Sequence, residues 1–238
     1  MTTAYRPAAT ISLSRFLSDP RLLGPDFAAP SWDNWKVTLK AAFGERMTEP
    51  ERERFRELAA RDPPTKRVRE LWLAIGRRGG KDSIAAAVAT YLAVYGNFQP
   101  FLRRGEKAVI ACIAVDREQA GIVFNYIKAQ FEQIDLLRSL LVSAKDDTIA
   151  LSTGVQIVVA TNSFRGRRGY TLACAIFDEL AFWRDEAYVN PDVEVYSALT
   201  KSMITLHAAG AMIIGISSVY RKSGLLYDKV TAPPRPTR

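Results

Sequence analysis

Short runs of continuous apolar residues recur along the chain, and helical patterns separate them. The runs predict buried strands and cover residues 71–75, 108–115, 172–177 and 211–216. The helical patterns cover residues 83–95, 117–134, 193–206 and 224–230. Residues 148–151 and 155–160 predict a hairpin. Apolar strands that alternate with helices indicate an α/β fold with a mainly parallel sheet flanked by helices.

The N-terminal part of the chain has a different pattern, with many prolines and short helical patches. Residues 51–61 alternate acidic and basic side chains at helical spacing and predict an exposed helix, which Pro63 and Pro64 are expected to end. We therefore expect a helical lid or subdomain at residues 1–66, the core domain at 67–230 and a Pro-rich linker or tail at 231–238.

Composition excludes few classes of function. The chain has 238 residues, 48% of them hydrophobic, and a formal net charge of +8, which favours polyanionic partners but is also common in other enzymes. Cys112 and Cys174 lie in apolar runs, so we expect core residues rather than a disulfide or a metal pair. Neither a membrane-spanning run nor a secretory signal is visible, which predicts a cytoplasmic protein.

A glycine-rich turn joins the first predicted strand to the first core helix. Glycines let backbone N–H groups curl around a phosphate, and the helix N-terminus adds positive potential. The predicted ATP-binding residues are Gly76, Arg77, Arg78, Gly79, Gly80, Lys81, Asp82 and Ser83. Lys81 is expected to reach the β- and γ-phosphates. The alternative is a turn that only caps the helix.

This turn departs from the usual phosphate-loop pattern in two ways. Three residues, rather than four, separate Gly76 from Gly80. Asp82 also replaces the Ser or Thr whose hydroxyl binds Mg²⁺, and its charge is expected to repel the β-phosphate. Ser83 lies about 100° further around the helix and is a poor substitute.

The predicted strand at residues 172–177 runs directly into Asp178 and Glu179. In phosphate-loop ATPases such a pair holds Mg²⁺ through water and activates the attacking water as general base. The alternative is a solvated loop start. Together with Lys81, the pair indicates an ATPase.

Two further segments are candidates for the same site. Residues 163–170 form an arginine- and glycine-rich loop that suits an arginine finger or contacts with DNA phosphates, or else is a basic surface loop. Ser217 and Ser218 follow the last strand, where hydroxyls can sense the γ-phosphate; the alternative is a Ser-rich turn.

Residues 70–81, 163–170, 174–183 and 215–220 together resemble the terminase large subunit family of tailed phages. The resemblance implies a P-loop NTPase of the additional-strand (ASCE) type. It also implies an ATPase motor that uses ATP and Mg²⁺ to translocate double-stranded viral DNA into a procapsid. Its implied partners are DNA, the portal protein, a small terminase subunit and further copies of the chain in a ring, in the cytoplasm of the bacterial host.

The resemblance also implies roles for single residues. Lys81 matches the phosphate-loop lysine, and Arg77 or Arg78 the loop arginine. Asp178 matches the metal-associated aspartate, and Glu179 the catalytic glutamate.

Later positions follow the family pattern less closely. Arg168 resembles a finger that acts on a neighbouring subunit. Ser217 and Ser218 match the coupling motif, although Val219 follows where the family more often has proline. The chain ends at Arg238, where the family's nuclease domain would begin, so we expect no nuclease activity.

Two other functions stay open from the sequence. Asp82 is compatible with a catalytically impaired prophage remnant or a nucleotide-binding module, and the core pattern with a helicase-like nucleic-acid ATPase. The long N-terminal part and the loop at residues 165–169 favour a terminase over a helicase. Trp32 and Trp35 are candidates for stacking on adenine, although core packing is the preferred interpretation.

Overall fold

The structure is a computed structural model and describes residues 10–161, 170–183, 191–220 and 222–232. It divides into two compact units, each described by itself below. The larger unit includes Arg69–Val230 and the smaller unit Ala9–Val68.

The larger unit is built on a seven-stranded sheet in the order β1-β7-β6-β2-β5-β4-β3. Its strands are β1 Glu70–Ala74, β2 Ala108–Ala114, β3 Leu141–Ala144, β4 Thr148–Leu151, β5 Val155–Thr161, β6 Thr171–Asp178 and β7 Met212–Ser217. The pairs among β1, β7, β6, β2 and β5 are parallel, whereas β4 pairs antiparallel with both β5 and β3. The predicted mainly parallel sheet is confirmed, and so is the hairpin.

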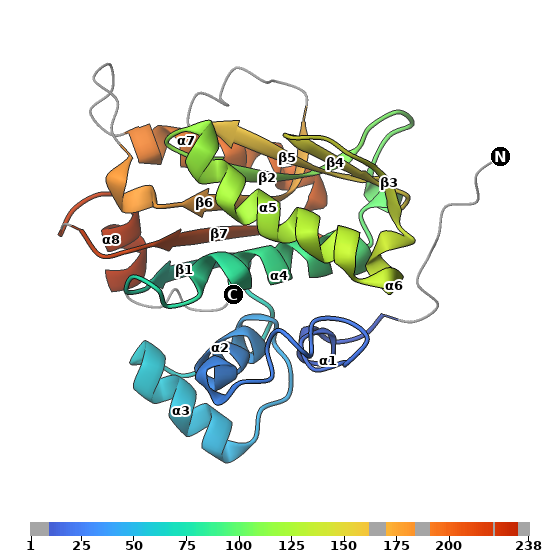
Figure 1. Cartoon of the computed structure of the whole chain (residues 1–238). Coiled ribbons are helices and arrows are strands. Elements are labelled where there is room, and N and C mark those ends of the chain that lie inside the picture. Colours follow the sequence, from blue (N-terminus) through green and yellow to red (C-terminus); the bar gives the residue numbers. More distant parts are fainter. Residues whose placement is uncertain (1–9, 162–169, 184–190, 221, 233–238) are drawn as a thin grey trace. The chain divides into compact units, whose positions relative to one another are not determined.

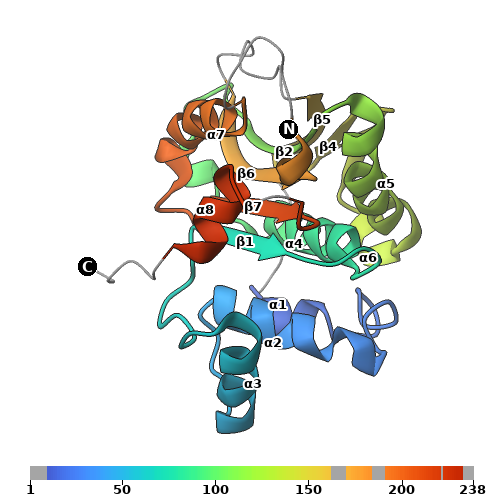
Figure 2. The same ribbon diagram turned by 90° about the vertical axis from the view of Figure 1, so that its left-hand side faces the viewer.

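Helices cover both faces of this sheet. They are α4 Lys81–Tyr95, α5 Arg117–Gln133, α6 Asp135–Arg138, α7 Pro191–Ser202 and α8 Leu225–Thr231, with 3-10 turns η2 Gln99–Phe101, η4 Leu180–Phe182 and η5 Ile204–Leu206. Helices α4 and α5 lie on one face, and α7 and α8 on the other (Figures 1 and 2). Burial from both sides explains why β2 and β6 read as continuous apolar runs.

The core follows the predicted pattern closely. The apolar positions expected to face inward on α5 are all buried; they are Ala120, Val123, Phe124, Ile127 and Phe131. Helix α4 is buried on nearly every side, which matches its alanine-rich sequence. Cys112 and Cys174 are both buried, as expected of core residues. None of the helices in the described ranges has the length and apolar character needed to cross a membrane.

The structure corrects the predicted elements at three places. Strand β3 was not predicted, because Val142 is 67% exposed on this edge strand and no continuous apolar run results. The helix predicted at residues 193–206 is instead α7 followed by η5. Strand β7 extends through Ser217, so this serine lies within the strand rather than after it.

The smaller unit is helical, with α1 Leu13–Phe16, η1 Pro30–Trp32, α2 Asp33–Ala42 and α3 Glu49–Ala59. Thr48 and Glu51 form a capping box at the start of α3, and Glu51 also accepts a 2.7 Å hydrogen bond from Lys40 on α2. The prediction that Pro63 and Pro64 end this helix is wrong. The helix ends at Ala59 because Ala60 adopts a left-handed conformation (φ 51°) before the prolines are reached.

The two tryptophans considered for adenine stacking both belong to the smaller unit. Trp35 is buried, and the ring of Trp32 packs edge-on against Phe27 with centroids 4.8 Å apart. These contacts favour the core-packing interpretation that the sequence analysis preferred.

Gly215 on β7 lies opposite Trp72 on β1, and a Cβ at Gly215 would lie 2.2 Å from the indole ring. The half-buried indole would have to move, together with the side chains packed on it, so we expect Gly215→Ala to lower the free energy of unfolding by about 3 kcal/mol. Gly121→Ala is the control, because a Cβ there meets nothing within 4 Å and alanine favours the helix by roughly 0.5–1 kcal/mol. Urea unfolding of both variants checks this; equal stabilities would contradict the close approach.

Candidate nucleotide-binding site

Four segments meet at the carboxyl edge of the parallel strands. The glycine-rich turn follows β1, and the first turn of α5 follows β2. Asp178 ends β6 and Glu179 follows it, whereas Ser217 ends β7 and Ser218 follows it. Ligands of open parallel sheets bind at this edge. The fold therefore brings together segments that lie as far apart in sequence as residues 76 and 218.

The glycine-rich turn is sharply bent and anchored to the neighbouring strand. The amide of Ile75 donates to the carbonyl of Ser217 at 3.0 Å, and the amide of Gly79 donates to the carbonyl of Gly76 at 3.1 Å. Arg78 and Gly80 have positive φ angles of 61° and 76°. Helix α4 then begins at Lys81, so its free N–H groups face the loop as a phosphate site requires.

Lys81 lies at the centre of the site and is 8% exposed. Its ammonium donates to Asp82 Oδ1 at 2.7 Å and to Asp178 Oδ1 at 2.9 Å, and lies 3.3 Å from Glu179 Oε1. Burial alone would lower the pKa of Lys81, but the hydrogen bonds to Asp82 and Asp178 outweigh it and raise the pKa. The lysine therefore stays charged and ties α4 to the end of β6.

Asp178 is 1% exposed, and each of its carboxylate oxygens has a different donor. Lys81 donates to Oδ1, and the side-chain amide of Gln119 on α5 donates to Oδ2 at 2.7 Å. Burial raises the pKa of Asp178 even though both donors favour the ionised form. The backbone carbonyl of Asp178 accepts a 2.9 Å hydrogen bond from the indole of Trp183.

Glu179 adopts a left-handed conformation with φ 48°, which is unusual for a residue with a side chain. Its Oε2 accepts from the hydroxyl of Ser217 and from the amide of Ser218, both at 3.1 Å. The amide of Ala181 donates to the Ser217 hydroxyl at 3.2 Å. The turn after β6 is thus fixed against the end of β7, and the glutamate is linked to both serines.

These contacts connect six of the thirteen predicted site residues. Lys81, Asp82, Asp178, Glu179, Ser217 and Ser218 form one connected group. Arg77 and Arg78 are exposed on the adjoining loop. Arg168 lies outside the described residues. The roles predicted for all of these residues stay predictions.

Sequence reasoning missed Gln119 and Trp183, which both contact Asp178. Gln119 follows the N-cap residue Asp116 at the carboxyl end of β2, the strand beside β6. That position in a parallel sheet is the signal that would have pointed to it. Trp183 gives no such signal, because its contact depends on the left-handed turn at Glu179.

The carboxylates of the site fit Mg²⁺ held mainly by water and phosphate oxygens. Mg²⁺ usually keeps several waters and takes one or two protein carboxylates, and Asp178 is a buried carboxylate at the strand end. Within the described ranges, no group of three or more His, Cys, Asp or Glu side chains is arranged to hold a metal ion by itself.

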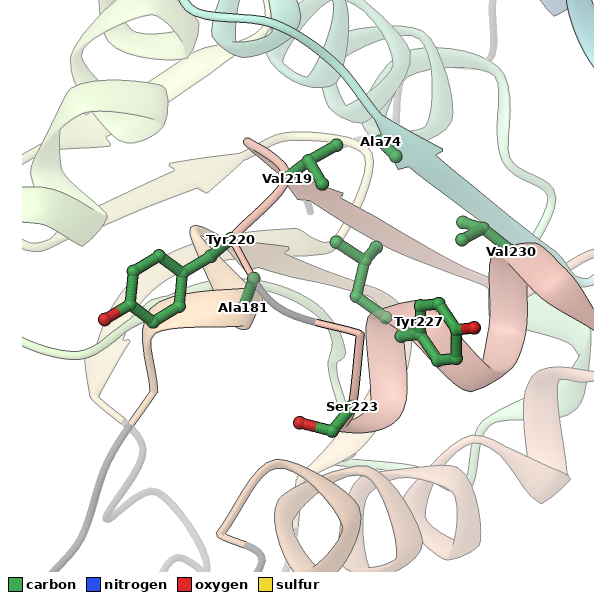
Figure 3. Close-up of a pocket in the computed structure, with 8 residues that line it drawn as sticks. Ala74, Ala181, Val219, Tyr220, Ser223, Tyr227 and Val230 are labelled. Atoms are coloured by element: carbon green, nitrogen blue, oxygen red, sulfur yellow. The ribbon is translucent and has the colours of Figure 1, made fainter.

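A small apolar pocket borders this site (Figure 3). Its lining residues are Ala74, Ala181, Val219, Tyr220, Ser223, Leu226, Tyr227 and Val230. It therefore lies between the ends of β1 and β7 and helix α8. Its mostly apolar lining distinguishes it from the charged group around Lys81.

Comparison with known proteins decides the family. The family model described as "Terminase large subunit, ATPase domain" matches residues 60–231. The chain belongs to this family. Its sheet, with the phosphate-loop strand β1 and the acidic strand β6 on either side of β7, is the ASCE arrangement of P-loop NTPases expected for a terminase ATPase domain.

Solved terminase structures show limited similarity to this terminase ATPase domain. The HK97 bacteriophage large terminase shares 20% identity with a TM-score of 0.49, over 78% of this chain and 37% of that one. The Thermus phage P74-26 large terminase ATPase domain shares 18% identity with a TM-score of 0.44, over 69% and 68% of the two chains. This chain thus spans little more than a third of the HK97 terminase. Curated proteins give no match.

The charges around Lys81 predict opposite effects of two neutralising substitutions. Burial raises the pKa of Asp178 above its usual value, so its ionised form is less favourable in the native state, and Asp178→Asn should raise the melting temperature at pH 7. The pKa of Lys81 is also raised, so its charge stabilises the native state up to alkaline pH. Lys81→Met should therefore destabilise it by about 3 kcal/mol.

Thermal unfolding at pH 7 without nucleotide or metal measures both effects. A lower melting temperature for both variants would show that the ionised Asp178 carboxylate does not destabilise the native state. An unchanged Lys81→Met variant would contradict the ion pair itself.

Proposed function

We propose that the chain is the ATPase part of a DNA-packaging motor, which couples ATP hydrolysis to translocation of double-stranded viral DNA into a procapsid. The observation that carries the proposal is the buried Lys81 on the phosphate loop, within 2.9 Å of Asp178 and 3.3 Å of Glu179. A lysine that meets both members of an acidic pair suits phosphoryl chemistry better than a structural turn does.

Each residue has a role that its position supports. On binding of a triphosphate, the loop amides and the start of α4 would bind phosphate oxygens, and Lys81 would turn from the carboxylates toward the β- and γ-phosphates. Asp178 would hold Mg²⁺ through water, and the bound metal neutralises charge on the phosphates. Glu179 would accept a proton from the attacking water. Arg77 or Arg78, exposed on the loop, would add positive charge.

Coupling between hydrolysis and movement would pass through the end of β7. Ser217 contacts Glu179 through its hydroxyl, and its carbonyl accepts from the amide of Ile75 at the start of the phosphate loop. A change at the γ-phosphate would therefore be transmitted to β7 through both Glu179 and the phosphate loop.

The remaining segments have proposed roles of their own. Arg168 would act as an arginine finger on a neighbouring subunit. Residues 1–66 would serve as a lid for the core at 67–230, and residues 231–238 as a linker.

The proposed partners follow from this role. They are double-stranded DNA, the portal protein, a small terminase subunit and further copies of the chain in a ring. The net charge of +8 supports a polyanionic partner. The proposed location is the cytoplasm of the bacterial host.

Glu179→Gln should strongly reduce Mg²⁺-dependent ATP hydrolysis and leave nucleotide binding intact. The substitution removes the proposed general base but keeps the size and shape of the side chain. We expect turnover to fall by roughly 10²–10⁴-fold. Phosphate release by the purified chain, with and without double-stranded DNA, measures this, with exposed Glu132→Gln as the control. Equal turnover in wild type and Glu179→Gln would contradict the role of the glutamate. Absence of stimulation by DNA would count against packaging.

Asp82→Ser should raise ATP turnover about tenfold. Asp82 contacts Lys81 at 2.7 Å, where it competes with phosphate for the lysine. Two like charges roughly 5 Å apart repel by about 3 kcal/mol at an effective dielectric constant near 20, so removing one favours the triphosphate. Steady-state kinetics of Asp82→Ser and Asp82→Asn separate loss of charge from gain of a hydroxyl. Lower turnover in both variants would show instead that the carboxylate is needed.

A further inference from the structure

We propose that Gln119 is a positioning residue for Asp178, which orients this carboxylate toward Mg²⁺ in the nucleotide-bound protein. The inference rests on the proposed function, because it concerns the metal that arrives with ATP. It goes beyond that function by giving the first turn of α5 a part in the site.

The contact itself is short and involves a buried acceptor. The side-chain amide nitrogen of Gln119 lies 2.7 Å from Asp178 Oδ2, while Lys81 binds Oδ1 from the opposite element, α4. Asp178 is 1% exposed, so its rotation is set by these donors rather than by water. Two donors on different oxygens fix the plane of the carboxylate.

Contacts at the start of α5 hold the backbone of Gln119 in place. Its amide donates to the N-cap carboxylate of Asp116 at 2.8 Å, and the next residue, Ala120, is 1% exposed in the core. Helix α5 follows β2 after a short turn, and β2 pairs with β6 in a register that sets Ile113 beside Phe177, the residue before Asp178. Gln119 thus comes from the helix that follows β2, the strand next to the one that carries Asp178.

A neutral amide suits this task for an electrostatic reason. Lys81 also holds Asp178, but its positive charge competes with a cation for the carboxylate, and the proposed mechanism moves it to the phosphates. Gln119 can keep donating to Oδ2 throughout, and it leaves the negative charge of Asp178 available to a metal-bound water. Hydrogen bonds of this kind behind a metal-associated group typically affect metal affinity or activity by 10–100-fold.

The test measures binding of a fluorescent, non-hydrolysable ATP analogue in EDTA and in saturating Mg²⁺. Gln119→Met removes the donor and keeps the length of the side chain; Gln119→Leu is a second variant in case one of the two folds poorly. Exposed Gln133→Met, at the other end of α5, is the matched control. We expect the ratio of Kd in EDTA to Kd in Mg²⁺ to fall about tenfold in the Gln119 variants. Kd in EDTA should change less than twofold.

A second arm distinguishes positioning from a general effect on folding. If Gln119 acts through Asp178, then adding Gln119→Met to Asp178→Asn should not lower the ratio further. An unchanged ratio in the Gln119 variants, or equal weakening with and without Mg²⁺, would overturn the inference while the proposed function stands. A wild-type chain that binds no nucleotide would instead overturn the proposed function, and the inference with it.

Discussion

The ion pair between Lys81 and Asp178 is the interaction on which the site depends. Asp178 ends a strand that is buried from both faces, and an ionised carboxylate there would be very unfavourable without a partner. Lys81, whose positive charge compensates this carboxylate, is the first residue of α4. The turn between β1 and α4 therefore has to bring the start of the helix close to the end of β6. The glycine-rich loop is the part of the chain that allows this course, with Gly80 at φ 76°.

Backbone strain is concentrated around the same interaction. Arg78 and Glu179 both have positive φ angles, and both lie within three residues of the ion pair. Such conformations persist only where neighbouring contacts hold them. For Glu179 these are the indole of Trp183 on the preceding carbonyl and the serines at the end of β7. These contacts hold the Glu179 side chain against the end of β7.

Much of this could be predicted from sequence, because it depends on local patterns. Buried strands and the α5 stripe follow from apolar spacing, and Lys81, Asp178 and Glu179 follow from short motifs. Strand β3 was missed because it is only four residues long, and Ser143 interrupts its apolar residues on an exposed edge of the sheet. The contact of Gln119 with Asp178 was missed for another reason: it depends on which strand lies beside β6, and strand order is a property of the whole sheet.

The charges around Lys81 bear directly on the role proposed for Asp82. The ammonium of Lys81 contacts three carboxylates: Asp82 at 2.7 Å, Asp178 at 2.9 Å and Glu179 at 3.3 Å. In the proposed mechanism, a bound triphosphate would add further negative charge, and Lys81 would move from the carboxylates to the phosphates. The exposed arginines of the loop and Mg²⁺ are suited to that exchange. Under the proposed function, a triphosphate would therefore have to compete with Asp82 for the ammonium of Lys81.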